Sequence, residues 1–298
     1  MKRIVVITYL LAIQFDCFSQ RQEYGVSGGV MNYIGDLSPG VSMSEFKPSF
    51  GVFYRDNIKD FFAMRYSLNY GTVAGTDQNW QFNRRRNLHF YSDIYEVSSI
   101  AEINFVKFGW SKFVQPATFF FGVGVSMFKF EPKATYRSGE VLLRQYGTEG
   151  QYMRHSRTYL PVTWAIPVGV GFKLHLSEKM VLALESFWRR TGTDYLDDMS
   201  NGLYTTDDKG LPRYTGYPDK VDMSKFNQMP HLDQTMTTAQ TRQLAIELSD
   251  RSSEGITDPA IGFAGKQRGN PLNKDWFITI GGTLSYRIVK VTCNKGSF

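Results

Sequence analysis

The residues of this sequence that could perform acid–base or metal chemistry are few and scattered. The histidines are His89, His155, His175 and His231. None lies in an HExxH pattern, and no pair of cysteines or histidines has the spacing of a zinc site. His155 and His231 could each supply a base, but nothing pairs either with a nucleophile, and no GxSxG elbow occurs. The sequence therefore predicts no catalytic residue, no metal site and no cofactor.

One acidic run could bind a cation. Asp194, Tyr195, Leu196, Asp197 and Asp198 place three carboxylates within five residues. Carboxylate oxygens are the ligands that Ca²⁺ prefers, so a calcium site is one interpretation. The spacing is not that of an EF-hand loop, however, and a hydrogen-bonded turn that follows a strand is the favoured alternative.

Apolar side chains alternate with polar or small ones in eight segments of the chain. The clearest segment, residues 62–70, alternates aromatic and aliphatic residues with Ala63, Arg65, Ser67 and Asn69. The other segments lie at about 24–30, 49–55, 95–105, 118–127, 164–173, 182–189 and 276–287. This period of two is typical of β-strands with one apolar face. Each segment also has about the length of a tilted transmembrane β-strand.

The connections between these segments alternate between short and long. The short ones are 56–60, 108–115 and 177–179, and the long ones are 34–46, 72–91, 131–160 and 191–274. Tight turns at one end and long loops at the other are typical of outer-membrane barrels. The sequence therefore predicts an all-β fold, an eight-stranded antiparallel transmembrane β-barrel with long extracellular loops. A soluble exported β protein is the alternative.

The N-terminus has the features of an export signal. Lys2 and Arg3 precede an apolar stretch, residues 4–13, and Cys17-Phe18-Ser19 is a small-x-small site. We predict a signal peptide at 1–19, Sec-type export, and a single multi-pass outer-membrane barrel domain at 20–298. Cys17 also suggests a lipoprotein, but Gln14-Phe15-Asp16 matches a lipobox poorly. Within the long connection at about 191–274, residues 237–249 carry Leu244, Ala245 and Leu248 on one face of a short predicted helix.

Composition narrows the class further. Of the 298 residues, 42% are hydrophobic and 15% aromatic, which excludes a disordered chain, and two cysteines exclude a disulfide-rich fold. The net charge of +6 is scattered, which suits an anionic membrane surface and argues against nucleic acid. Outer-membrane lipid and lipopolysaccharide are therefore the expected surroundings. The run Arg84-Arg85-Arg86 could contact lipopolysaccharide phosphates, or it could be a solvated cluster at the membrane rim.

The small and polar face of the predicted strands carries charges of both signs. An eight-stranded barrel has an interior that side chains can fill, so we expect these charges to pair and to plug the lumen. The role that this predicts is structural. The residues of this lumen charge network are Arg55, Arg65, Glu96, Glu102, Lys173, Glu185, Arg189 and Arg287.

Several stretches of the sequence resemble one family. They are Tyr33-Ile34-Gly35-Asp36-Leu37; Lys47-Pro48 with Gly51-Val52-Phe53-Tyr54-Arg55; Asn87-Leu88-His89-Phe90; Gly147, Thr148, Glu149, Gly150 and Gln151; Asp194 to Asp198; and Gln267, Arg268, Gly269 and Asn270 with Lys274-Asp275-Trp276. Together they cover essentially the whole chain after the export signal. On these motifs the sequence resembles the PorG-like outer-membrane β-barrel proteins of the type IX secretion system of the Bacteroidetes.

The resemblance implies a role in protein secretion without catalysis. PorG-like proteins associate with the periplasmic ring formed by PorK and PorN, and in gliding relatives the system also delivers surface adhesins for motility. The resemblance thus implies PorK/PorN-like ring proteins as partners and assigns no role to the motif residues. Two alternatives remain: a generic small barrel whose loops bind an extracellular ligand or surface, and an enzyme that acts on lipid or peptide at the barrel rim.

Overall fold

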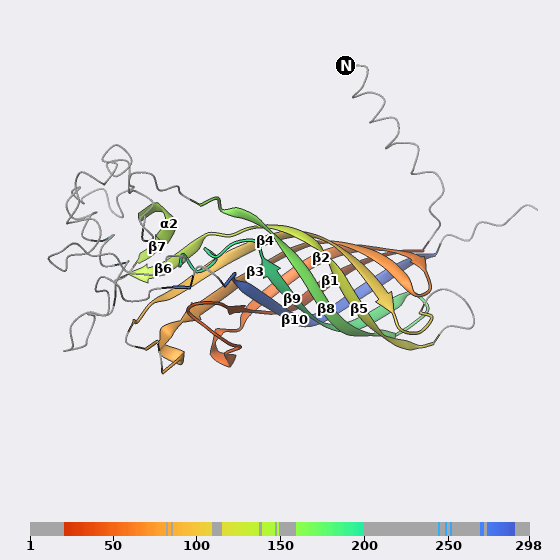
Figure 1. Ribbon diagram of the computed structural model, residues 1–298. Helices are drawn as coiled ribbons and strands as arrows, with labels where there is room; N and C mark the ends of the chain where they lie inside the picture. Colours follow the sequence, from red (N-terminus) through yellow and green to blue (C-terminus); the bar gives the residue numbers. More distant parts are fainter. Residues whose placement is uncertain are drawn as a thin grey trace, which may run out of the picture.

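The computed structural model describes residues 21–81, 83–84, 86–108, 115–136, 139–146, 148, 159–199, 244, 248, 251, 269–270 and 273–289. These residues form an antiparallel β-barrel, shown in Figure 1. No helix among them is long and apolar enough to cross a membrane. The predicted export signal at 1–19 lies outside the described residues.

Eight strands close the barrel. They are β1 (Arg21–Ile34), β2 (Lys47–Lys59), β3 (Phe62–Thr76), β4 (His89–Asn104), β5 (Ala117–Lys129), β8 (Val162–His175), β9 (Met180–Thr191) and β10 (Trp276–Val289). Each pairs antiparallel with its neighbours in the chain, and β1 pairs with β10 from Arg21↔Val289 to Ile34↔Trp276. This closure satisfies the backbone of both edges. The predicted eight-stranded barrel is confirmed, with each strand longer than its alternating segment.

A short hairpin outside the eight barrel strands extends the wall, where the sequence predicted only a loop. β6 (Pro132–Tyr136) pairs with β4 and with β7 (Gly139–Leu142), which leads into the short helix α2 (Leu143–Tyr146). These strands are too short to show a clear alternation, which is why the period-two pattern missed them. Two further 3-10 turns, η2 (Met43–Glu45) and η3 (Asp77–Asn79), lie in the first two long connections.

The two ends of the barrel differ. We call the end with the connections 60–61, 105–116 and 176–179 the turn end, where β1 begins and β10 ends. The opposite end, with the connections 35–46, 77–88, 130–161 and 192–275, is the loop end. Figure 1 shows β6, β7 and α2 beyond the barrel at the loop end. The predicted alternation therefore holds in part: 60–61 and 176–179 are short and 130–161 and 192–275 are long, but 105–116 has twelve residues, as many as 35–46 and 77–88.

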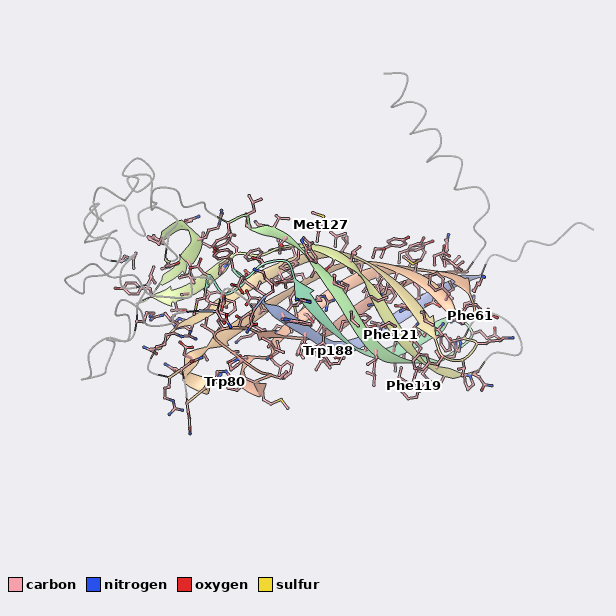
Figure 2. All side chains as sticks on the ribbon, viewed as in Figure 1. Phe61, Trp80, Phe119, Phe121, Met127 and Trp188 are labelled. Carbon is pink, nitrogen blue, oxygen red and sulfur yellow. The ribbon has the colours of Figure 1, made fainter. Side chains whose placement is uncertain are left out.

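The outer surface of the barrel is apolar. On β3, Leu68 is 58% exposed, whereas its neighbour Ser67 points inward and is 7% exposed. Figure 2 shows Phe119, Met127 and Trp188 on the outside of the barrel, and all three are exposed. An exposed apolar band around a closed barrel is the surface that lipid requires.

This apolar band ends toward the loop end. On several strands the outward residue changes there from apolar to polar in one step of two residues. The pairs are Tyr70 and Thr72 on β3, Tyr95 and Asp93 on β4, Met127 and Lys129 on β5, Trp188 and Arg190 on β9, and Trp276 in β10 with Lys274 just before it. Such aromatic and basic residues mark the interface between membrane and water.

The main hydrophobic core lies at the loop end and not in the middle of the barrel. It joins the ends of the strands, including Tyr33 and Phe90, to loop residues such as Leu196. Leu244 and Leu248, from the predicted helix at 237–249, are helical and buried in this core. The rest of that predicted helix lies outside the described residues.

The strand faces can be tested by placing a charge on each. We expect Leu68→Arg to lower the free energy of unfolding by about 1–3 kcal/mol, because the guanidinium would enter the hydrocarbon below the aromatic border at Tyr70. Val168→Arg, also outward and exposed, should act in the same way. Ser67→Arg should destabilise through crowding in the lumen instead. Chemical denaturation in bilayers measures all three, and a harmless Leu68→Arg would contradict the orientation of β3.

Candidate functional site

The part of the lumen nearer the turn end is organised around Glu102, two residues before the end of β4. Its carboxylate lies 2.9 Å from Arg55 Nε and 2.6 Å from Lys173 Nζ. Arg65 Nε stands 3.3 Å away. These side chains are buried, and they come from four different strands, β2, β3, β4 and β8. The carboxylate of Glu102 therefore bridges three cations inside the barrel, and Glu23 and Glu185 supply further negative charge to Arg55 and Arg65.

A second carboxylate, Glu23 on β1, continues this cluster toward the turn end. Arg55 Nη1 donates to Glu23 at 2.8 Å, and Arg287 Nε donates to it at 2.7 Å. Asn57 Nδ2 donates at 3.0 Å to Glu23 Oε1, the same oxygen that accepts from Arg287. The sequence analysis missed Glu23, although it precedes Tyr24 on the inward parity of β1, and extending the alternation by one step would have found it.

Toward the loop end, two further ion pairs line the same interior. Arg189 Nε donates to Glu96 at 2.7 Å, and Arg65 Nη1 donates to Glu185 at 2.6 Å. Arg189 also donates to Thr279 Oγ1 at 2.6 Å. All eight residues of the lumen charge network thus point into the barrel and pair with one another or with Glu23.

Little space remains around these ion pairs. A cavity of about 40 Å³ lies between Arg65, Glu185 and Arg189, which is room for only a few water molecules. At the turn end, the ring of Phe108 stacks on His175 with 4.0 Å between centroids, and Arg287 contacts the same histidine at 3.0 Å. This arrangement fits a filled interior and not a wide pore.

A separate polar cluster holds the loop end together. The hydroxyl of Tyr33, on β1, lies 2.6 Å from Asp197 Oδ2 and 3.0 Å from Asp275 Oδ1. Asp275 Oδ2 accepts from the backbone N–H of Leu196 at 2.9 Å, and Asp197 Oδ1 accepts from that of Met199 at 3.0 Å. Tyr33 and both carboxyls are buried.

The number of protons needed for these hydrogen bonds determines the charge of this cluster. A tyrosine hydroxyl carries one proton and can donate to only one of the two carboxyls. The other short contact requires a carboxyl that is itself protonated. Burial raises the pKa of Asp197 and of Asp275 well above the ordinary value. The neighbouring charges of Asp275 and Asp36 raise the pKa of Asp197 further. The charge of Asp194 does the same for Asp275. The geometry and the electrostatics therefore agree on a shared proton.

The motif at Tyr33 to Leu37 also contacts other loops of the loop end through Asp36. Asp36 Oδ2 accepts from the backbone N–H of Asn270 at 2.6 Å, and the Asp36 carbonyl accepts from Arg86 at 2.8 Å. Arg86 also forms a buried ion pair with Asp77 at 2.6 Å. Arg86 is thus part of the loop packing, which corrects its interpretation as a solvated residue or a phosphate contact, whereas Arg84 is exposed. Arg85 lies outside the described residues.

Asp198 connects the acidic run to the motif that contains Thr148. Its carboxylate contacts Thr148 Oγ1 and accepts from Tyr159 Oη at 2.6 Å. The Tyr159 ring stacks on Tyr195 with 4.5 Å between centroids. Asp198 has φ of 60°, a left-handed conformation that aspartate tolerates better than most residues. The run from Asp194 to Asp198 is therefore a tight turn after β9.

The remaining predicted residues divide into described and undescribed ones. Gly269 is described and lies next to Asn270. Gly147, Glu149, Gly150, Gln151 and Arg268, with His155 and His231, lie outside the described residues. His89 contacts Arg251, and His175 contacts Arg287. Within the described part of the chain, no group of histidine, cysteine, aspartate and glutamate is arranged to hold a metal ion.

Gly35 shows how closely the motifs fit. A Cβ added at this position would collide with the Tyr33 hydroxyl and with Asp275 Oδ1. Only glycine lets the first loop pass this close to the shared-proton cluster. Most of the described motif residues, far apart in the sequence, thus meet in one packed assembly at the loop end, whereas Gly51 to Arg55 lie along β2 in the barrel wall.

Fold and interior together define the class: an eight-stranded β-barrel of outer-membrane type with an ion-paired lumen. The chain belongs to a family described as a domain of unknown function (DUF6089), which it matches over residues 2–208. The comparison with curated proteins finds no match.

Solved structures similar to this chain are small outer-membrane barrels. Neisserial surface protein A is 8% identical with a TM-score of 0.38, over 91% of this chain and 98% of that one. The outer membrane protein OprG of Pseudomonas aeruginosa is 9% identical with a TM-score of 0.35, over 90% and 97%. Ail, the attachment invasion locus protein of Yersinia pestis, is 8% identical with a TM-score of 0.33, over 57% and 88%.

Proposed function

We propose that this protein is a non-enzymatic anchor in the outer membrane that positions the periplasmic PorK/PorN-like ring of the type IX secretion system. The observation that carries the proposal is the filled lumen, in which Glu102, Glu23 and their cationic partners occupy the interior. A barrel of this kind passes neither folded cargo nor a stream of solutes, so its function lies in its surfaces. The resemblance of its motifs to PorG-like proteins supports the choice of partner.

The proposal places the partner at the turn end. The ring is periplasmic, and an even strand number puts both chain ends on one side, which an exported barrel keeps in the periplasm. The contact surface then includes the connections 60–61 and 176–179, with Lys59 and Glu178, next to the first residues of β1 and the last of β10. The loop-end motifs have a different task in this account, which is to cover the lumen.

A second candidate is a barrel whose loops bind an extracellular ligand or surface. One observation favours it: the motifs converge at the loop end, where Tyr33, Asp197, Asp275 and Asp36 hold the loops in a defined arrangement. A fixed loop assembly can hold recognition residues in a defined arrangement. Its partner would be found outside the cell.

A deletion strain tests the proposal. We expect it to lose secretion of type IX cargo while the outer membrane keeps its normal permeability to small solutes, because the filled lumen conducts little. Complementation with His155→Ala or His231→Ala should restore secretion, since neither histidine is assigned chemistry. Normal cargo secretion in the deletion strain, together with a defect in surface binding, would favour the second candidate.

A further inference from the structure

The barrel wall has a notch at the loop end beside β3. The last pair between β2 and β3 is Ser49↔Gly71, whereas β3 continues to Thr76 along β4. Pro48, which has no N–H to donate, lies where β2 stops pairing with β3. A cavity of about 460 Å³ occupies this place, and its lining includes Lys47, Pro48, Thr72, Thr76, Asn79 and Tyr91.

The notch opens just beyond the apolar band. Directly below it, three outward aromatic residues lie side by side on adjacent strands: Phe50 is 62% exposed, Tyr70 43% and Tyr95 56%. Phe50 is opposite Tyr70, and the rings of Tyr70 and Tyr95 are 5.0 Å apart. Exposed aromatic residues of this kind lie at the level of lipid headgroups. The notch is therefore at headgroup depth in the leaflet at the loop end.

Lys47 supplies the charge of the notch. In the described part of the chain, its ammonium has no hydrogen bond or ion pair with another side chain. The nearby carboxylate of Glu45 is buried and already accepts from Ser38 Oγ at 2.5 Å and from Asn79 Nδ2 at 2.6 Å. Its acceptor oxygens are thus directed at protein donors, which leaves Lys47 to attract an anion.

The other groups around the notch are polar and can form hydrogen bonds. Lys133 is held by Asp93 at 3.0 Å and does not compete with Lys47. The hydroxyl groups of Ser44 and Thr76, which also line the cavity, can bond to hydroxyls of a ligand. An ammonium with several neutral donors and acceptors beside an aromatic belt suits a phosphorylated sugar headgroup.

From this juxtaposition we propose that the notch binds the phosphorylated sugar headgroup of a membrane lipid in the leaflet at the loop end, with Lys47 contacting the phosphate. The acyl chains of the lipid would run down the wall past Tyr70 and Leu68. A bound lipid of this kind fills the gap in the wall between β2 and β3. The site is separate from the turn end and does not depend on the secretion partner.

Lipid titration by native mass spectrometry tests the site. The probe is lipid A, and the comparison lipid is the same molecule without phosphates, both added to the full chain refolded in a neutral detergent. We expect Lys47→Gln to weaken lipid A binding about tenfold, which corresponds to the loss of one charged hydrogen bond. Lys129→Gln is the matched control, because Lys129 is an exposed cation at the loop-end terminus of β5, outside the notch, and the affinity of this variant should stay within about twofold of the original.

A second variant protects the test against misfolding. Ala74→Trp fills the notch from β3, and it should abolish lipid A binding while the barrel keeps its heat-modifiable migration on gels. Wild-type affinity in Lys47→Gln and Ala74→Trp would overturn the proposal, as would equal binding of the dephosphorylated lipid. A photo-crosslinker at Thr76 in native membranes should form lipid adducts, and adducts with protein alone would also overturn it.

Discussion

Glu102→Ala should lower the free energy of unfolding of the barrel by about 3–5 kcal/mol. The substitution leaves Arg55, Arg65 and Lys173 buried around a site that has lost its carboxylate. Uncompensated buried charge is among the largest destabilising effects that one substitution produces. Urea denaturation of the refolded barrel in bilayers, followed by tryptophan fluorescence, measures the change.

Two further variants isolate the electrostatic cause. Adding Lys173→Met to Glu102→Ala removes one stranded cation and should restore part of the lost stability, a coupling that a double-mutant cycle quantifies. Glu178→Ala, at the exposed turn before β9, should change stability by less than about 0.5 kcal/mol. If Glu102→Ala were as stable as Glu178→Ala, the ion-paired lumen would not hold the barrel together.

Tyr33→Phe should lower the free energy of local unfolding of the loop end by about 1–3 kcal/mol. The substitution leaves the carboxyls of Asp197 and Asp275 buried without the tyrosine hydroxyl that contacts both. Asp275→Asn should be tolerated much better. Its carboxamide can accept from Leu196 N–H and donate to the Tyr33 oxygen, which reproduces the protonated acid. Hydrogen-exchange protection of the Leu196 and Met199 amides reports the stability of this cluster.

The same cluster predicts a pH dependence. Asp197 and Asp275 have folded-state pKa values above the ordinary 3.8. The folded state therefore binds more protons than the unfolded state, and loop-end stability is greatest at low pH and falls as the pH rises from 3.8 through the folded-state pKa values. Protection of the Leu196 amide should therefore decline as the pH rises above 3.8, and less so in Asp275→Asn. A rise in protection with pH would contradict the shared proton.

The barrel could be predicted from sequence because its signal is local. Residues such as Leu68 and Ser67 alternate over a single strand, and the lengths of the connections reveal the two ends. The hairpin of β6 and β7 could not be predicted in this way, since its strands are too short to show a period. Its position depends on pairing with β4 near Tyr91.

The inside of the barrel and the loop end were predictable to different degrees. Inward charges such as Arg55 and Glu102 follow from strand parity, but which charge meets which depends on the register around the closed barrel. The loop-end cluster was not predictable from spacing, because Tyr33, Asp197 and Asp275 are separated by up to 242 positions. Arg86 was misinterpreted for the same reason, since its partners Asp77 and Asp36 become visible only in the folded loops.

The proposed anchoring role is tested most directly by site-specific photo-crosslinking in native membranes. A crosslinker at Glu178, exposed at the turn end, should form adducts with the periplasmic ring proteins of the PorK/PorN type. A crosslinker at Gln81, exposed at the loop end, should not. Adducts from Gln81 to components outside the cell, with none from Glu178 to the ring, would contradict the anchor and favour a barrel that binds its partner through the loops.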